Sequence, residues 1–271
     1  MRPAKHWIEA KLLPRGWVDL LREFALFVVA FVLYDLVREA VAHGSPYKPF
    51  GDATKIIDFE RALHIFAEPS IQAWAANVHW LMTALAWTYL NTQFVVTVAA
   101  MAFIYVRHNR SFYFVRNMFL ISMGLALIGY WLFPTAPPRL MPEWGFTDPV
   151  SQMLAGPTSS IGYTRAASVT NMYAAVPSMH VCFAVMVAGS MARLVSWRWA
   201  KFVCALYPPL VIFVVVATAN HFFVDVLLGF VTAGVATVLA RRLPARARPR
   251  DVGIRPRVGV ASTPWPTTPT S

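Results

Sequence analysis

The chain of 271 residues has few charged side chains and few cysteines. Only 14% of its residues are charged and 57% are hydrophobic, whereas a soluble domain carries about 25% charge. This shortage of charge excludes an ordinary water-soluble domain. The two cysteines, Cys182 and Cys204, lie in apolar runs without a Cys-x-x-Cys pair or a Cys/His ligand spacing. Neither a disulfide framework nor a zinc site is therefore indicated, and we expect two small buried side chains.

Apolar stretches near 18 residues long recur along the chain, and this length crosses a bilayer as a helix. The first stretch contains Asp35 and is not followed by a small-residue cleavage site, so we interpret it as a retained span. The second is interrupted by polar residues at 89–93, where we expect an interfacial piece at 78–88 and then a span that ends at Val106. The other five predicted spans are about 18–42, 112–133, 178–194, 201–218 and 221–239.

These stretches predict an all-α fold, a polytopic membrane protein with six transmembrane helices and an interfacial amphipathic helix. The interfacial helix is expected at 56–66, where apolar residues recur at helical spacing. A long loop rich in Pro, Gly, Ser and Thr occupies 134–176, and such loops are usually functional or disordered. We divide the chain into a cytoplasmic N-terminal segment at 1–16, a six-helix membrane domain at 17–240 and a disordered cytoplasmic tail at 241–271.

Basic residues give the chain a formal net charge of +11. In a membrane protein such residues flank the spans and hold their orientation, so we expect no nucleic acid as a partner. With a cytoplasmic N-terminus and six spans, eighteen of the 24 Lys and Arg residues fall in cytoplasmic segments. This excess predicts a cell-membrane protein with both termini in the cytoplasm. The starts of the fourth and sixth spans then face the outer side, together with the long loop.

Polar residues suited to chemistry gather on that outer side. His221 and Asp225 stand four residues apart at the start of the sixth span, a spacing that stacks two side chains on one helix face. Ionisable groups are costly in a membrane segment and therefore indicate a functional site. His180 begins the fourth span after Pro177 and Ser178, where a helix N-terminus offers N–H groups to an anion.

Together these groups predict phosphoryl transfer that requires no metal and no cofactor. Arg139 in the long loop is a permanent cation with a planar fork that suits phosphate oxygens. We expect His221 to attack phosphorus, Asp225 to fix its tautomer, and His180 to protonate the leaving oxygen as general acid. Arg139 and Ser178 are the predicted phosphate-binding residues, although a role as helix N-cap is by itself a sufficient explanation of Ser178. Water or an alcohol then takes the phosphoryl group from His221.

Three motifs are similar to those of a known family. Residues 174–180 (Ala-Ala-Val-Pro-Ser-Met-His) and the set Asn220-His221-x-x-x-Asp225 resemble two motifs of the type-2 phosphatidic acid phosphatase superfamily, which includes vanadium haloperoxidases. Residues 133–139 (Phe-Pro-Thr-Ala-Pro-Pro-Arg) resemble the first motif of its inositol phosphorylceramide synthase-like branch. The resemblance covers about residues 55–240. It implies a six-helix membrane core, a phosphohistidine on His221, and a lipid phosphate or phosphodiester as substrate.

Two positions depart from the broader pattern of this superfamily. That pattern has a Lys seven residues before the Arg of the first motif and an Arg six residues before the nucleophilic His. Here these positions hold Leu132 and Val215, and Arg165 and Asn220 are the candidates to replace the missing cations. A phosphomonoester dianion needs more positive charge than a phosphodiester monoanion. The departures therefore favour transfer of a phospho-headgroup between lipids.

The sequence thus predicts an integral membrane phosphotransferase that acts on lipid phosphodiesters at the outer leaflet, with inositol phosphate-type headgroup transfer as the leading reaction. Its expected partners are this lipid substrate, an alcohol or water as acceptor, and the surrounding membrane lipids. The first alternative is a lipid phosphate or polyprenyl diphosphate phosphatase, in which water is the acceptor. A second alternative, which the missing cations favour, is a non-catalytic membrane scaffold. The donor lipid, the acceptor and the oligomeric state stay open.

Overall fold

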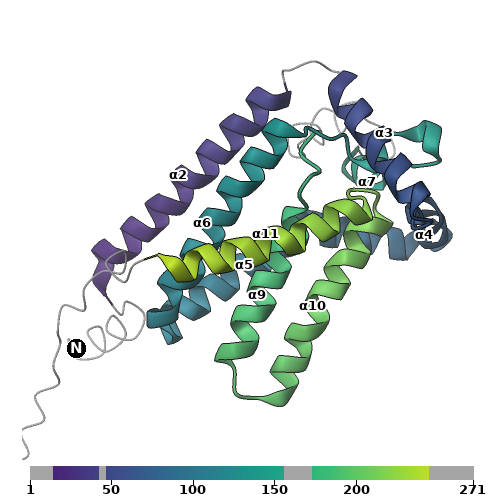
Figure 1. Cartoon of the computed structure of the whole chain (residues 1–271). Helices are drawn as coiled ribbons and strands as arrows, with labels where there is room; N and C mark the ends of the chain where they lie inside the picture. The colour runs from purple at the N-terminus through teal and green to yellow at the C-terminus, as the bar shows by residue number, and fades with distance from the viewer. Residues whose placement is uncertain (1–14, 43–46, 156–172, 244–271) are drawn as a thin grey trace, which may run out of the picture.

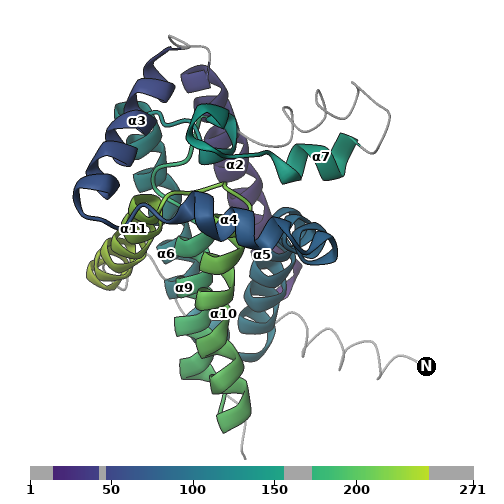
Figure 2. The same cartoon turned by 90° about the vertical axis from the view of Figure 1, so that its right-hand side faces the viewer.

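A computed structural model describes residues 15–42, 47–155 and 173–243. Within these ranges the chain forms helices and no strand, which confirms the all-α prediction. The long helices are α2 (Gly16–Ala42), α5 (His79–Arg107), α6 (Asn109–Leu132), α9 (Met179–Leu194), α10 (Arg198–Ala217) and α11 (Phe223–Arg242). The short ones are α3 (Tyr47–Ala62), α4 (Glu68–Ala76), α7 (Pro149–Ala155) and the 3-10 turns η1 (Pro138–Leu140) and η2 (Pro142–Trp144). In two views α3, α4 and α7 lie toward one end, away from the turn between α9 and α10 (Figure 1, Figure 2).

Four of the described helices, α5, α6, α10 and α11, are long and apolar enough to cross a membrane. No more than 44% of the apolar window of any of them is buried, and the apolar side chains left exposed require lipid around them. These helices identify an integral membrane protein. α2 carries the charged residues Arg22, Glu23 and Asp35 in or beside its apolar centre, and is therefore not one of these four. α9 has only 16 residues and is shorter than a typical membrane span. The count of six spans stays a prediction.

The predicted break between a piece at 78–88 and a separate span is wrong, because α5 begins at His79 and runs without a break to Arg107. Tyr89, Asn91 and Gln93 are accommodated within the helix, because their side chains bond within it or line a pocket. The Asn91 side-chain amide, for example, donates to the carbonyl of Trp87 at 2.8 Å. A polar interruption in an apolar run is thus a polar helix face here, and not a helix end.

Two other predicted segments differ in their boundaries. The helix expected at 56–66 is α3, which begins at Tyr47 and ends at Ala62, and its interfacial location stays a prediction. The long loop contains η1, η2 and α7 before the described residues stop. Arg165 and the tail beyond residue 243 lie outside the described residues.

The largest buried apolar cluster lies among α5, α6, α9 and α11, and partly buried side chains of α2 pack against it. Cys182 is fully buried in this cluster, as expected, whereas Cys204 on α10 is half-buried. Both thiols are free. The cluster holds together the helices whose ends meet at the site described below.

α2 is held to α6 by polar contacts as well. The guanidinium of Arg116 on α6 donates to both carboxylate oxygens of Glu23, at 2.7 and 2.8 Å. One turn away, the hydroxyls of Tyr105 and Tyr113 donate to Asp19 at 3.0 and 2.7 Å. Breaking a buried pair of this kind costs about 3–5 kcal/mol, because one charge is left without its partner.

Two glycines allow helices to approach the segment that leads into α9. A Cβ added to Gly229 of α11 would lie 2.6 Å from the carbonyl oxygen of Ser178. A Cβ added to Gly129 of α6 would lie 2.8 Å from Cδ of Pro177. No side chain fits at these distances, so the backbones of α6 and α11 pack directly against this segment.

We expect Gly229→Ala to destabilise the protein by roughly 1–3 kcal/mol, because the added methyl group meets a backbone oxygen. Gly234→Ala on the same helix is the matched control, since its Cβ meets no atom within 4 Å. Thermal unfolding of both variants in detergent measures the difference. Equal melting temperatures would contradict the close approach of α11 to α9.

Candidate active site

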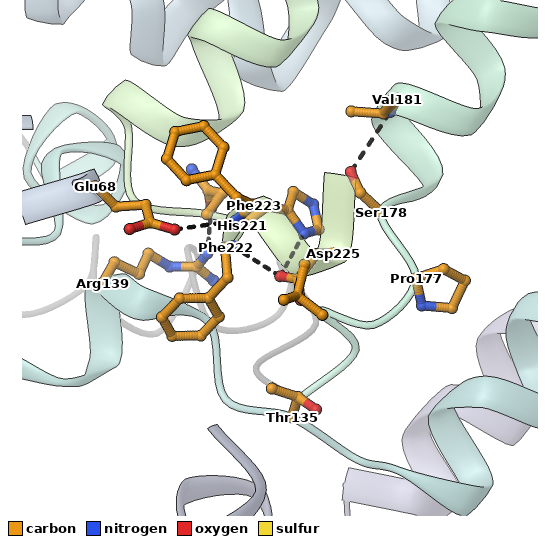
Figure 3. Close-up of polar contacts among 12 residues, drawn as sticks. Glu68, Thr135, Arg139, Pro177, Ser178, Val181, His221, Phe222, Phe223 and Asp225 are labelled. Atoms are coloured by element: carbon orange, nitrogen blue, oxygen red, sulfur yellow. Dashed lines mark hydrogen bonds and ion pairs between the residues drawn. The ribbon is translucent and has the colours of Figure 1, made fainter. Parts of the chain in front are cut away.

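Three segments that are distant in the sequence meet at the site. They are 133–139 after α6, 173–180 leading into α9, and 218–225 between α10 and α11. Backbone amides join each pair of segments, and the bonds are Thr135 to the Tyr173 carbonyl at 3.0 Å, Arg139 to the Ala219 carbonyl at 2.8 Å, and Ser178 to the Asp225 carbonyl at 3.1 Å. The three sequence motifs therefore form one connected unit, parts of which are drawn in Figure 3.

His221 and Asp225 contact one another, although His221 precedes the helix. Nδ1 of His221 lies 3.3 Å from Oδ2 of Asp225, whose side chain is fully buried. The same oxygen accepts from the amide of Phe222 at 2.9 Å (Figure 3). The carboxylate thus bends back from the first turn of α11 and caps it, and this holds the imidazole with Nδ1 on the carboxylate side. Nε2 is the nitrogen left for chemistry.

The protonation state of His221 follows from its surroundings. Burial, reinforced by the nearby Arg139 guanidinium, lowers the pKa of His221 to about 3. The imidazole is therefore neutral at physiological pH and keeps a lone pair for attack. A neutral ring that becomes positive during attack is stabilised by the adjacent carboxylate.

His180 lies on the first turn of α9 and faces His221. Their ring centroids are 5.8 Å apart, with the planes tilted by 58°. On its other side His180 stacks on Tyr89 of α5, at 4.4 Å between centroids. This stacking fixes the plane of the second imidazole. His180 on α9 and His221 in the turn before α11 thus line one pocket.

Arg139 reaches the site from η1 and is buried, with 6% of its surface exposed. Its guanidinium donates to the side-chain oxygen of Asn220, and its Nε lies 3.6 Å from Asp148. Asn220 in turn donates to the hydroxyl of Thr218 at 2.8 Å. Within the described chain, Asp148 is therefore the one carboxylate that forms an ion pair with Arg139. The motifs do not include this residue.

Ser178 has a structural role in the described chain. Its hydroxyl accepts from the amide of Val181 at 3.4 Å, so it is the N-cap of α9 (Figure 3). The side chain is fully buried and is not among the described residues that line the pocket. Its contact with a phosphate stays a prediction.

The pocket between these groups has a volume of about 230 Å³. Its polar lining residues in the described chain are Tyr34, Tyr89, Gln93, Tyr130, Arg139, His180, Asn220 and His221. Arg139 is the one Lys or Arg among them. Leu132 is 60% exposed and points away from the core, while Val215 is fully buried in an apolar cluster. The two departures from the broader motif pattern therefore bring no cation to the described pocket.

A family model described as the PAP2 superfamily matches residues 54–239. This chain belongs to the PAP2 superfamily. Membership supports phosphatase or phosphotransferase chemistry on lipid phosphates, and so an enzyme of phosphoryl transfer. No curated protein and no solved structure matches the chain. The match reaches the superfamily, and the inositol phosphorylceramide synthase-like branch stays a prediction.

This PAP2 superfamily member also has two site features that the motifs do not contain. Glu68 of α4 accepts from the amide of Phe223 at 2.9 Å (Figure 3), and Glu60 of α3 accepts from the amide of Val224 at 2.8 Å. With Asp225, three carboxylates therefore bind three consecutive amides at the start of α11. Neither glutamate is among the site residues predicted from the sequence, because nothing in the local pattern marks either residue.

The geometry makes His221→Ala the severest single substitution, and we expect it to abolish turnover. Asp225→Asn should lower kcat by about 10⁴-fold, since an amide that donates to Nδ1 stabilises the wrong tautomer, as for the corresponding change in serine proteases. His79→Ala, at an exposed histidine on α5, is the control and should keep normal turnover. Near-normal activity of His221→Ala would rule out a covalent histidine intermediate.

Proposed function

We propose that this PAP2 superfamily member is a membrane phosphotransferase that moves an inositol phosphate-type headgroup between lipids at the outer leaflet, through a phosphohistidine on His221. The observation that supports this proposal most strongly is the charge of the pocket. In the described chain a single guanidinium lines it, and this cation is partly offset by Asp148 at 3.6 Å. A phosphodiester carries one negative charge, whereas a phosphomonoester carries nearly two. One cation matches the diester.

The remaining pocket wall supports a polyol headgroup. Tyr34, Tyr89, Tyr130 and Gln93 line it from α2, α5 and α6. Their hydroxyl and amide groups both donate and accept hydrogen bonds, which suits the hydroxyls of a sugar or an inositol. The second phosphate of a polyprenyl diphosphate would meet neutral groups in that position, so this wall favours the transferase over the diphosphate phosphatase.

The proposed reaction has two displacements. Nε2 of His221 attacks phosphorus, and a P–N bond forms as the P–O bond to the donor lipid alcohol breaks. His180, which takes up a proton when the anionic substrate binds beside it, gives this proton to the leaving oxygen. An acceptor alcohol then loses its proton to His180 and attacks phosphorus, and the P–N bond breaks. Arg139 stabilises the equatorial oxygens in both steps. The outer-leaflet location rests on the charge bias of the loops.

The acceptor requirement tests this proposal. Purified protein is incubated with phosphatidylinositol labelled in the inositol ring, with and without ceramide, a lipid alcohol that differs from the diacylglycerol released by the donor. We expect the label to reach a new lipid only when the alcohol is present, and His221→Ala to transfer none. Phosphatidic acid labelled in its phosphate is the comparison substrate. Release of free phosphate at full rate without an acceptor would show a phosphatase instead.

Vanadate separates an enzyme from a scaffold, because it adopts the trigonal-bipyramidal geometry of a phosphoryl group in transfer. We expect the wild-type protein to bind vanadate and His221→Ala to lose most of this affinity. Isothermal titration in detergent measures both, with His79→Ala as control. Absence of binding to the wild type would favour the non-catalytic scaffold.

A further inference from the structure

Two glutamates bind the backbone that carries His221. Glu60 on α3 and Glu68 on α4 are both 0% exposed. Oε1 of Glu68 accepts from Phe223 at 2.9 Å, and Oε1 of Glu60 accepts from Val224 at 2.8 Å. The two amides directly follow the turn that holds His221, so any movement of these glutamates is transmitted to the nucleophile.

The other oxygen of each glutamate lacks a donor. Neither Oε2 atom receives a hydrogen bond from the described part of the chain, and the two side chains approach one another because they bind the amides of adjacent residues. Two carboxylates repel, whereas a carboxylic acid and a carboxylate share one proton. A single proton between the Oε2 atoms satisfies both groups, whereas without it each buried oxygen keeps the full cost of its desolvation.

We propose that Glu60 and Glu68 form a carboxyl pair with one shared proton, which fixes the start of α11 and so positions His221 for attack. The proposal rests on the proposed phosphoryl transfer through His221. Both glutamates are positioning residues, because neither lines the described pocket. Without the pair, two amides lose rigid acceptors and the turn shifts. A shift of about 1 Å at a reacting group slows catalysis roughly 100-fold.

The pair should titrate at alkaline pH. Burial raises the pKa of Glu60 to about 9, and the neighbouring Glu68 contributes to this rise. The charged groups that face Glu60 are Glu68 of α4 and Asp225 of α11, and both are acidic. Because the folded-state pKa is raised, the shared proton is held through neutral pH and is lost as the pH rises through about 9.

Glutamine substitutions test the shared proton directly. In Glu60→Gln, Oε1 still accepts from Val224, and the amide nitrogen replaces the proton by donating to Glu68. Glu68→Gln alone supplies the same bond in the reverse direction. In the double variant each side chain turns an NH₂ group toward the other, and no acceptor is left between them. Two conservative changes are thus tolerated singly and disruptive together.

The experiment measures kcat and KM with labelled phosphatidylinositol and a lipid alcohol as acceptor. We expect Glu60→Leu and the double variant Glu60→Gln/Glu68→Gln to lower kcat by roughly 30–100-fold, with KM changed less than about threefold. Glu60→Gln should restore most of the kcat that Glu60→Leu loses. Glu143→Gln, at an exposed glutamate in η2, is the control for a change of charge alone.

The pH profile is the second measurement. Wild-type kcat should decline from about pH 8 to about pH 10, and Glu60→Gln should not show this decline because its amide does not titrate. A double variant with wild-type kcat overturns the proposal, and so does an unchanged alkaline decline in Glu60→Gln. If the double variant fails to fold, the pH profile of the single variant decides. A failure of the proposed transferase function is seen separately, because the wild-type protein then turns over without an acceptor. The comparison of kcat among the glutamate variants still holds in that case.

Discussion

Carboxylate capping of α11 is the interaction on which the rest of the site depends. Asp225, Glu68 and Glu60 accept in turn from the three consecutive amides at 222–224. A helix N-terminus leaves its first N–H groups without partners, and in an apolar surrounding such groups must be bonded. Because α3 and α4 supply two of the acceptors, these short peripheral helices hold the backbone next to His221, the proposed nucleophile.

The capping also divides the charges around His221 into two sides. Asp225 contacts the Nδ1 edge of the ring, where the proposed mechanism develops positive charge, whereas Arg139 is the cation that the proposal assigns to the incoming phosphate. Since the first amides of α11 are occupied by carboxylates, the positive end of this helix is not open to the substrate. We therefore expect the anion to bind at Arg139 and at the N-terminus of α9, where His180 lies. The start of α11 thus positions the proposed nucleophile, whereas the start of α9 is expected to bind the phosphate.

The hydropathy of the sequence predicts the helical membrane architecture. It also reveals the ionisable residues that stand out within the apolar runs. His221 and His180 are predictable because ionisable side chains are costly within apolar runs. Glu60 and Glu68 are not, because they lie in polar segments where glutamate is common, and only folding brings them to an amide about 160 residues away. The polar residues at 89–93 fit either a break between helices or a pocket-facing side of one helix. The local spacing of residues does not distinguish a helix break from a pocket-facing helix side, because most of the pocket wall comes from other segments of the chain.

The buried pair of Glu23 and Arg116 bears on how this protein enters the membrane. The two residues are 2% and 7% exposed and belong to α2 and α6, separated by 93 positions. During synthesis α2 is made first, and Glu23 has no partner until α6 follows. An unpaired charge in an apolar surrounding costs several kcal/mol. We therefore expect α2 to reach its final place only as half of a pair with α6, the helix whose end opens the active-site loop.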